Sequence, residues 1–263
     1  MFPDLITIGG FTIHTYGVLV AIGLLVGFYV GLYFAKKEGI TEKDYENTFL
    51  ITVFAGIFGA RIAYIIEHKE EFNSVFDFVA IWNGGIDWFG GFIGGLVGSL
   101  AYLSYKKISL LKFADVAGIA IPIGHFFGRL GCTSAGCCHG KPVPEDSPFR
   151  DIAIIFPNDP HCQAPAGVPL YPTQPVEALG NLTIFFILFY IYRKKSFDGQ
   201  IFSLYLVLYG LERFLLEFWR GVTPPIPGLG LTWNQIVTLG MVIFGLTSFF
   251  ILKSRYNKQQ ISS

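Results

Sequence analysis

Residues 124–131 read Gly124-His125-Phe126-Phe127-Gly128-Arg129-Leu130-Gly131 and place a charged side chain inside an apolar stretch that extends from residue 113 to 131. About 20 apolar residues are enough to cross the hydrocarbon core of a bilayer. A charge at that depth costs several kcal/mol unless it is paired, so it marks a functional site by default. The planar guanidinium of Arg129 matches two phosphate oxygens at once. The stretch therefore indicates a membrane enzyme that handles an anionic lipid.

The composition agrees with a membrane protein. Charged residues make up 14% of the chain and hydrophobic residues 52%, and the mean hydropathy is +0.52. The net charge is zero, so no basic surface indicates a nucleic-acid partner. Residues 1–10 contain no Lys or Arg and no cleavage site, which predicts that the first apolar segment is retained as a span.

The distribution of apolar residues predicts an all-α membrane protein with about seven transmembrane helices. The expected spans are residues 15–35, 47–66, 88–105, 113–131, 176–192, 200–219 and 233–252. The third is rich in glycine and the fourth contains Pro122, so either is a candidate for a broken or re-entrant element. We expect one catalytic membrane domain over residues 1–253, followed by a cytoplasmic tail over residues 254–263.

The basic residues predict the orientation of the chain. Most of the 19 lie in alternate loops, near residues 36–43, 106–112, 193–195 and 253–258. Because cytoplasmic loops carry the excess of Lys and Arg, the N-terminus is expected outside and the C-terminus in the cytoplasm. The loop over residues 132–175 is then extracytoplasmic and structured, and Arg129 lies at the outer end of its span.

The sixth span carries four polar residues on one helical face: Tyr209, Arg213, Glu217 and Arg220. A structural ion pair between Arg213 and Glu217 is one interpretation. An anion site is favoured, because Arg129 independently points to the same outer half of the membrane. Arg220 alone is explained by snorkelling to the outer interface.

Other polar and small residues have competing interpretations. Arg61 either binds ligand or snorkels. Gly90 and Gly91 pack against a neighbouring helix and also allow a lipid head group to approach the backbone. Tyr16 is an interfacial aromatic or a hydrogen-bond partner at the depth of the arginines. Glu177 complements a helix dipole, and residues 232–235 form a capping box with no chemistry assigned.

The four cysteines all lie in the predicted outer loop, where disulfides persist. They are Cys132, Cys137, Cys138 and Cys162. Disulfide pairing is favoured, but the pairs are not assigned. Zinc binding and reactive thiols are the alternatives, although the spacing matches no standard zinc pattern. We therefore expect neither a metal nor another cofactor.

Six motifs in order resemble the prolipoprotein diacylglyceryl transferase family of the bacterial inner membrane, over nearly the whole chain. The motifs are His14-Thr15-Tyr16-Gly17, Gly59-Ala60-Arg61-Ile62, Trp82-Asn83-Gly84-Gly85 with Gly90-Gly91-Phe92-Ile93-Gly94, Gly128-Arg129-Leu130-Gly131, Tyr171-Pro172-Thr173-Gln174 with Glu177, and Tyr209-Gly210-Leu211-Glu212-Arg213 with Glu217. The resemblance implies a multi-pass enzyme whose active site faces the outer leaflet. It implies transfer of the diacylglyceryl group of phosphatidylglycerol to the thiol of a lipobox cysteine in a prolipoprotein signal peptide, with release of glycerol phosphate.

By this resemblance, five residues match family positions tied to activity: Tyr16, Arg129, Gly140, Arg213 and Glu217. Two arginines would offset the charge of the departing phosphate, and a base would raise the thiolate fraction of the attacking cysteine. His139 completes the expected catalytic set of Arg129, Arg213, Glu217, Tyr16 and His139. The expected substrate-binding set is Arg129, Arg213, Arg61, Tyr209, Gly90, Gly91 and Gly140.

The chain also departs from the family pattern. Phe89 stands where the family usually carries a histidine, and Cys132 and Cys137 replace an Asn and a Glu. Phenylalanine cannot accept a proton, so a base must lie elsewhere, with His14, His125 and His139 as candidates, or the family histidine is not obligatory. Alternative functions are a non-catalytic or differently specific lipid-binding paralogue and, less favoured, a membrane thiol oxidoreductase.

Overall fold

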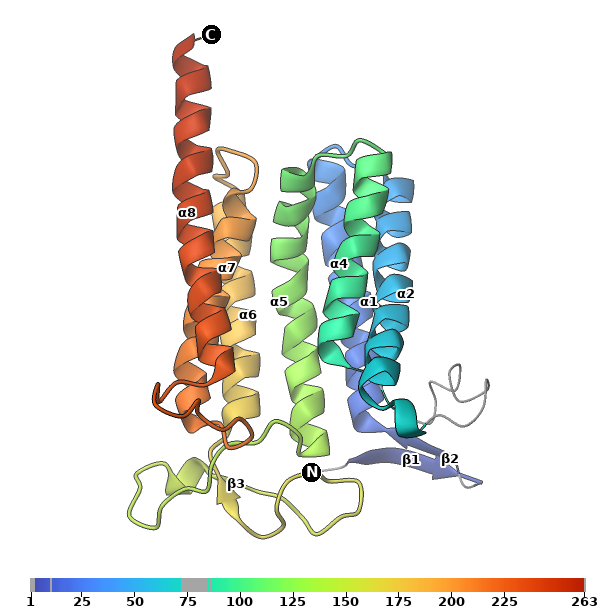
Figure 1. Ribbon diagram of the computed structural model, residues 1–263, viewed down its shortest axis with the longest axis vertical. Helices are drawn as coiled ribbons and strands as arrows, with labels where there is room; N and C mark the ends of the chain where they lie inside the picture. Colours follow the sequence, from blue (N-terminus) through green and yellow to red (C-terminus); the bar gives the residue numbers. More distant parts are fainter. Residues whose placement is uncertain (1–2, 10, 72–84, 86, 263) are drawn as a thin grey trace. The chain divides into compact units, whose positions relative to one another are not determined.

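The computed structural model describes residues 3–9, 11–71, 85 and 87–262, and in these the chain is mainly helical (Figure 1). The helices are α1 (Thr15–Lys37), α2 (Glu42–Glu67), α4 (Trp88–Tyr105), α5 (Leu110–Ala135), α6 (Thr173–Tyr192), α7 (Gln200–Leu216) and α8 (Trp233–Ser262). Short 3-10 turns cover Lys69–Glu71, Arg150–Ile152 and Glu217–Trp219. Two antiparallel hairpins pair β1 (Asp4–Ile8) with β2 (Phe11–His14) and β3 (Ile154–Ile155) with β4 (Pro169–Leu170).

Each of the seven predicted apolar windows coincides with one helix. Five helices, α1, α2, α5, α6 and α8, are long and apolar enough to cross a membrane, so the protein is a multi-pass membrane protein. The helices α4 and α7 are shorter, with 18 and 17 residues. The expectation of a broken third or fourth span is wrong, because α4 is continuous and α5 passes through Pro122.

Several helix ends lie a few residues from the predicted windows, and α7 ends at Leu216 rather than at residue 219. The helix α5 continues to Ala135, so Cys132 lies in its last turns rather than in the following loop. The helix α8 continues to Ser262, so the predicted tail is helical. Both extensions contain helix-compatible residues beyond the apolar window, which a hydropathy criterion excludes.

The described chain divides into two compact units. One comprises Met1–Gly31 with Ala114–Ser263, and the other comprises Leu32–Phe113. That both belong to a single catalytic domain remains a prediction. Of the family motifs, Trp82, Asn83 and Gly84 lie outside the described residues.

The unit Leu32–Phe113 is built on the contact of α2 with α4. A Cβ atom at Gly90 would collide with the Gly59 carbonyl oxygen and the Ala63 side chain, whereas one at Gly91 would lie 3.4 Å from the Ala60 Cβ atom. Small residues therefore allow the two backbones to approach closely, as in other membrane helix pairs.

This difference predicts unequal effects of alanine at two neighbouring positions. Gly90→Ala is expected to destabilise the protein by about 1–3 kcal/mol, because the added methyl overpacks the α2–α4 contact. Gly91→Ala is the matched control and is expected to unfold close to wild type. Thermal unfolding of both variants in detergent tests this, and equal midpoints would contradict it.

In the other unit, α7 packs against α6 and α8 (Figure 1). Asp115 of α5 fixes the start of α7. Its carboxylate accepts hydrogen bonds from the backbone N–H groups of Gly199 at 2.8 Å and Phe202 at 3.0 Å. The same carboxylate pairs with Lys195 at 2.9 Å. These contacts set the register of α7 against α5, and with it the placement of the polar residues of α7.

The segment between α5 and α6 is structured around a small apolar cluster of Phe156, Ala164 and Leu170. It also contacts the β1–β2 hairpin, since Asp4 accepts from His14 at 2.7 Å and from His161 at 2.8 Å. Desolvation acts to raise the pKa of the Asp4 carboxyl, but the hydrogen bonds from His161 and His14 outweigh it and lower the pKa. The hairpin is thereby attached to this segment.

Candidate active site

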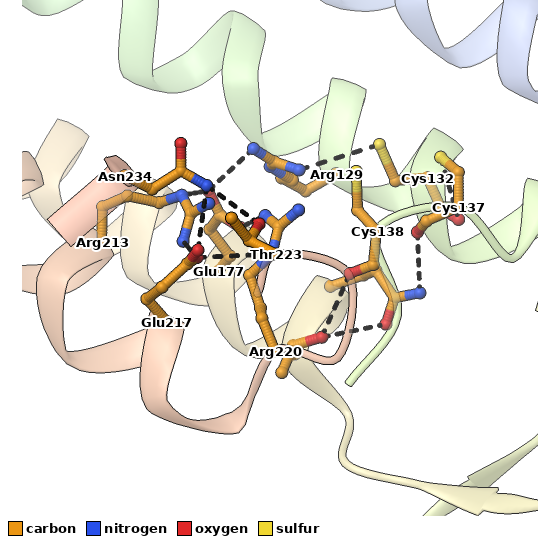
Figure 2. A network of polar contacts seen from close by, with 12 residues as sticks. Arg129, Cys132, Cys137, Cys138, Glu177, Arg213, Glu217, Arg220, Thr223 and Asn234 are labelled. Atoms are coloured by element: carbon orange, nitrogen blue, oxygen red, sulfur yellow. Dashed lines mark hydrogen bonds and ion pairs between the residues drawn. The ribbon is translucent and has the colours of Figure 1, made fainter. Parts of the chain in front are cut away.

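A buried carboxylate, Glu177, forms the centre of the polar network in this unit (Figure 2). Its Oε1 atom lies 2.9 Å from Arg129 of α5 and 3.7 Å from Arg213 of α7. Its Oε2 atom lies 3.8 Å from Arg220, just beyond α7. The Glu177 side chain is 1% exposed. One residue in the first turns of α6 therefore joins three arginines from separate parts of the chain.

A second carboxylate, Glu217, completes the network. It pairs with Arg213 at 2.5 Å and with Arg220 at 3.6 Å. Its Oε1 atom accepts hydrogen bonds from the Thr232 hydroxyl at 3.1 Å and from the Asn234 amide at 2.9 Å. The ion-pair interpretation of Arg213 and Glu217 is thus confirmed, as part of a larger cluster. The favoured interpretation, an anion site, stays a prediction.

The network carries an excess of positive charge, because three guanidinium groups face two carboxylates. The side chains of Arg129, Arg213 and Arg220 are only 13%, 9% and 7% exposed. In addition, the Nε atom of Arg129 is buried and has no hydrogen-bond partner among the described residues. Buried donors normally have a partner, so an unpaired one marks a position for a ligand. The arrangement suits a singly charged anion such as a phosphodiester.

The cysteines lie beside Arg129. All four are free thiols, so the favoured prediction of disulfides is wrong. The sulfur atoms of Cys132, Cys137 and Cys138 lie within 4.8 Å of one another. The Cys132 sulfur is 4.0 Å from the Arg129 guanidinium, and Figure 2 shows the three thiols on one side of that group.

A tight turn brings these three thiols together. Gly136 and Cys138 have positive φ angles of 70° and 57°, which reverse the chain after α5. The turn is held to α6, since Gln174 donates to the Cys137 carbonyl at 3.0 Å and Thr173 donates to the Cys138 carbonyl at 3.3 Å. The spacing of the cysteines in the sequence does not predict backbone geometry of this kind.

Gly140 follows this turn and lies between two backbone segments. It forms an isolated β-bridge with Arg220, and the neighbouring Lys141 nitrogen donates to the Trp219 carbonyl at 2.8 Å. On its other side, a Cβ atom at Gly140 would collide with the Tyr171 carbonyl oxygen. Glycine at this position therefore allows the chain to lie against the Tyr171 backbone while it pairs with Arg220.

Gly140→Ala is accordingly expected to lower stability by about 1–3 kcal/mol through overpacking and to displace Arg220. Gly240→Ala in α8 is the control, because a Cβ atom there meets nothing within 4 Å. Thermal unfolding in detergent measures the stability. An unchanged midpoint for Gly140→Ala would show that the backbone contact is dispensable.

The remaining predicted residues occupy three settings. Tyr16 packs on α5, where a Cβ atom at Gly131 would lie 3.1 Å from its ring. The ring of Tyr209 lies 5.3 Å from that of His125. His139 lies in the cysteine turn, with Nδ1 3.0 Å from the Gly140 carbonyl oxygen.

Arg61, Gly90 and Gly91 belong to the unit Leu32–Phe113. Arg61 is 7% exposed and donates to the Gly85 carbonyl at 2.8 Å. Of the two interpretations of Arg61, this burial disfavours snorkelling, and ligand binding stays a prediction.

Four members of the network lie outside the predicted site: Glu177, Arg220, Thr232 and Asn234. The helix dipole and snorkelling explain Glu177 and Arg220 from sequence, yet the Arg220 side chain is only 7% exposed. The predicted capping box is confirmed by the bonds between Thr232 and Gln235, at 2.9 Å and 3.2 Å. However, Thr232 and Asn234 of that box also bind Glu217. One sequence feature could have identified Glu177 as a site residue. It is a carboxylate expected at the same membrane depth as arginines that lacked a partner.

Comparison with known proteins gives the family. The sequence matches the family described as prolipoprotein diacylglyceryl transferase over residues 3–251. It is 31% identical to the phosphatidylglycerol–prolipoprotein diacylglyceryl transferase of Clostridium tetani over 98% of this chain and 100% of that protein. The chain belongs to this family. A similarly named transferase 2 of Clostridium perfringens is 32% identical over 95% of each chain, and the transferase of Thermotoga maritima is 30% identical over 94% of this chain and 83% of that protein.

Membership in the diacylglyceryl transferase family agrees with the chemistry of the network. A transferase acting on a phospholipid must hold a phosphodiester and stabilise the phosphate that leaves. The cluster of Arg129, Arg213 and Arg220 supplies buried cations of the required type.

Proposed function

We propose that this protein transfers the diacylglyceryl group of phosphatidylglycerol to the lipobox cysteine thiol of prolipoproteins. The product is a thioether, and glycerol phosphate is released. The observation that carries the proposal is the buried cluster of three arginines against two carboxylates, in a chain of the prolipoprotein diacylglyceryl transferase family.

The reaction begins with the cysteine thiolate, which is the nucleophilic form. Its sulfur attacks the terminal glycerol carbon of the diacylglyceryl group, and the bond from that carbon to the phosphate oxygen breaks. Negative charge then develops on the leaving phosphate. Arg129 and Arg213 are assigned to stabilise it, while Glu217 holds Arg213 in place. Tyr16, Tyr209 and Gly140 are assigned to orient the substrates.

The proposed setting is the bacterial inner membrane, with seven spans and the N-terminus outside. The positive-inside pattern of the loops supports this orientation. It places the segment between α5 and α6, and the network beside it, towards the outer leaflet. Arg61, Gly90 and Gly91 are further proposed to contact substrate.

The direct test uses purified protein in nanodiscs with phosphatidylglycerol and a lipobox peptide. Mass spectrometry is expected to detect a peptide that carries the diacylglyceryl group on its cysteine. A peptide with serine in place of cysteine is the control. If folded protein forms no adduct while a working relative does, the proposed function is wrong.

A further inference from the structure

We propose that Cys132, Cys137 and Cys138 bind one zinc-class divalent cation, whose open fourth position takes the thiol of the substrate peptide. The inference rests on the proposed function for the identity of that thiol. The cation site itself stands on the geometry of the three cysteines. It also replaces the expectation of no metal, which was based on sequence spacing alone.

The distances fit such a site. Zinc binds thiolate sulfur at about 2.3 Å with tetrahedral geometry, so ligand sulfurs lie about 3.8 Å apart. The three sulfurs here lie within 4.8 Å of one another, a spacing compatible with that separation. The free state of all three thiols leaves them available as ligands.

The number of protein ligands indicates a cation site with one coordination position left for substrate. Among the described residues, the grouped potential ligands at this turn are the three cysteines and no fourth side chain. Structural zinc sites use four protein ligands, whereas sites that act on a substrate use three and leave one position open. The cysteines are half-buried, so the open position is accessible to a peptide side chain.

The surroundings provide charge balance and support. Three thiolates with a divalent cation carry one negative charge, and the Arg129 guanidinium lies 4.0 Å from the Cys132 sulfur. The backbone of the turn is fixed by Gln174 and Thr173, which bind the Cys137 and Cys138 carbonyls. Such outer contacts orient metal ligands and are part of most functional sites.

This site would supply a route to the thiolate that needs no histidine base. Phe89 stands at the position of the usual family histidine and cannot accept a proton. A thiol that coordinates a divalent cation is deprotonated outright, and its proton passes to water. The bound sulfur then attacks the glycerol carbon, the carbon–oxygen bond breaks, and the phosphate keeps the electron pair. The cation does not change its oxidation state, so no oxidant or reductant is needed.

The location supports this sequence of events. Arg129 contacts both the cysteine group, through Cys132, and the carboxylate centre, through Glu177 at 2.9 Å. A thiolate at the cation and a phosphodiester at the arginines would therefore be neighbours. This proximity is what a bimolecular displacement requires.

The test measures the metal first and the reaction second. The zinc content of purified, reduced full-length protein is measured by elemental mass spectrometry, and metal-free protein is titrated with Co²⁺. We expect one metal per chain and the absorption bands of tetrahedral cobalt–thiolate. Cys138→Ser is expected to weaken Co²⁺ binding at least tenfold. Cys162→Ser is the matched control, because Cys162 contacts the same turn near Gly136 but lies outside the group.

The lipobox peptide then probes the open position. Adding it to the Co²⁺ protein is expected to shift the visible bands, whereas the peptide with serine in place of cysteine is not. Removing the metal from wild type is expected to reduce adduct formation at least tenfold, with recovery on adding Zn²⁺. This comparison needs no variant and so does not depend on the folding of one.

The outcomes separate the two proposals. Folded wild type that binds no metal overturns the cation site. Wild type that binds the metal but forms adduct equally well without it overturns the role of the cation in the reaction. Both outcomes leave the transferase intact. Metal binding without a response to the peptide thiol overturns the open position. Metal binding with the peptide response, but without any adduct, supports the site and contradicts the proposed transferase reaction.

Discussion

Glu177→Gln is expected to abolish detectable adduct formation and to lower the free energy of unfolding by about 3–5 kcal/mol. Glutamine keeps the shape of the side chain but removes its charge. Arg129, Arg213 and Arg220 would then face Glu217 alone, and Arg129 would lose its carboxylate at 2.9 Å. Breaking a buried ion pair by neutralising one partner leaves uncompensated charge in a medium of low dielectric.

Glu212→Gln is the matched control for this prediction. Glu212 is also a glutamate of the helical bundle, but its two carboxylate oxygens are buried without a hydrogen-bond partner among the described residues. Within the part of the chain that the structure describes, Glu212 also forms no ion pair, so replacing it is expected to change stability less. Thermal unfolding in detergent and the adduct assay measure both variants. Equal stability of the two would refute a central role for Glu177.

The helices of this protein were predictable because hydropathy alone determines which segments enter a bilayer. The network was only partly predictable, because its members come from α5, α6, α7 and the start of α8. Arg129 and Arg213 were evident as charges within apolar segments. A carboxylate near the start of a helix has an ordinary explanation in the helix dipole. Only the contacts of Glu177 with Arg129, Arg213 and Arg220 in the folded chain show its three partners.

Arg220 shows why local sequence was not sufficient. An arginine at the end of an apolar stretch normally snorkels to the interface. Here the bridge between Gly140 and Arg220 turns the chain inward after α7, and the side chain becomes buried. The gathering of the cysteines has the same origin, since it depends on positive φ angles at Gly136 and Cys138. Both features are set by backbone contacts between segments distant in sequence.

Arg129→Ala is expected to reduce kcat/KM for adduct formation by about 100–1000-fold, the usual effect of removing one group that stabilises transition-state charge. Its effect on folding is expected to be smaller than that of Glu177→Gln. Without Arg129, Glu177 still faces Arg213 at 3.7 Å and Arg220 at 3.8 Å. The two remaining arginines then balance the carboxylates of Glu177 and Glu217.

The comparison of substitutions makes this prediction specific for phosphate recognition. Arg129→Lys keeps the charge but loses the planar fork that binds two oxygens, so an intermediate loss of kcat/KM is expected. Arg150→Ala is the control, because Arg150 is an exposed arginine of the segment between α5 and α6 and is expected to behave as wild type. Rates are measured with phosphatidylglycerol and the lipobox peptide in nanodiscs. A folded Arg129→Ala protein that retains more than a tenth of the wild-type rate would exclude Arg129 from the stabilisation of the leaving phosphate.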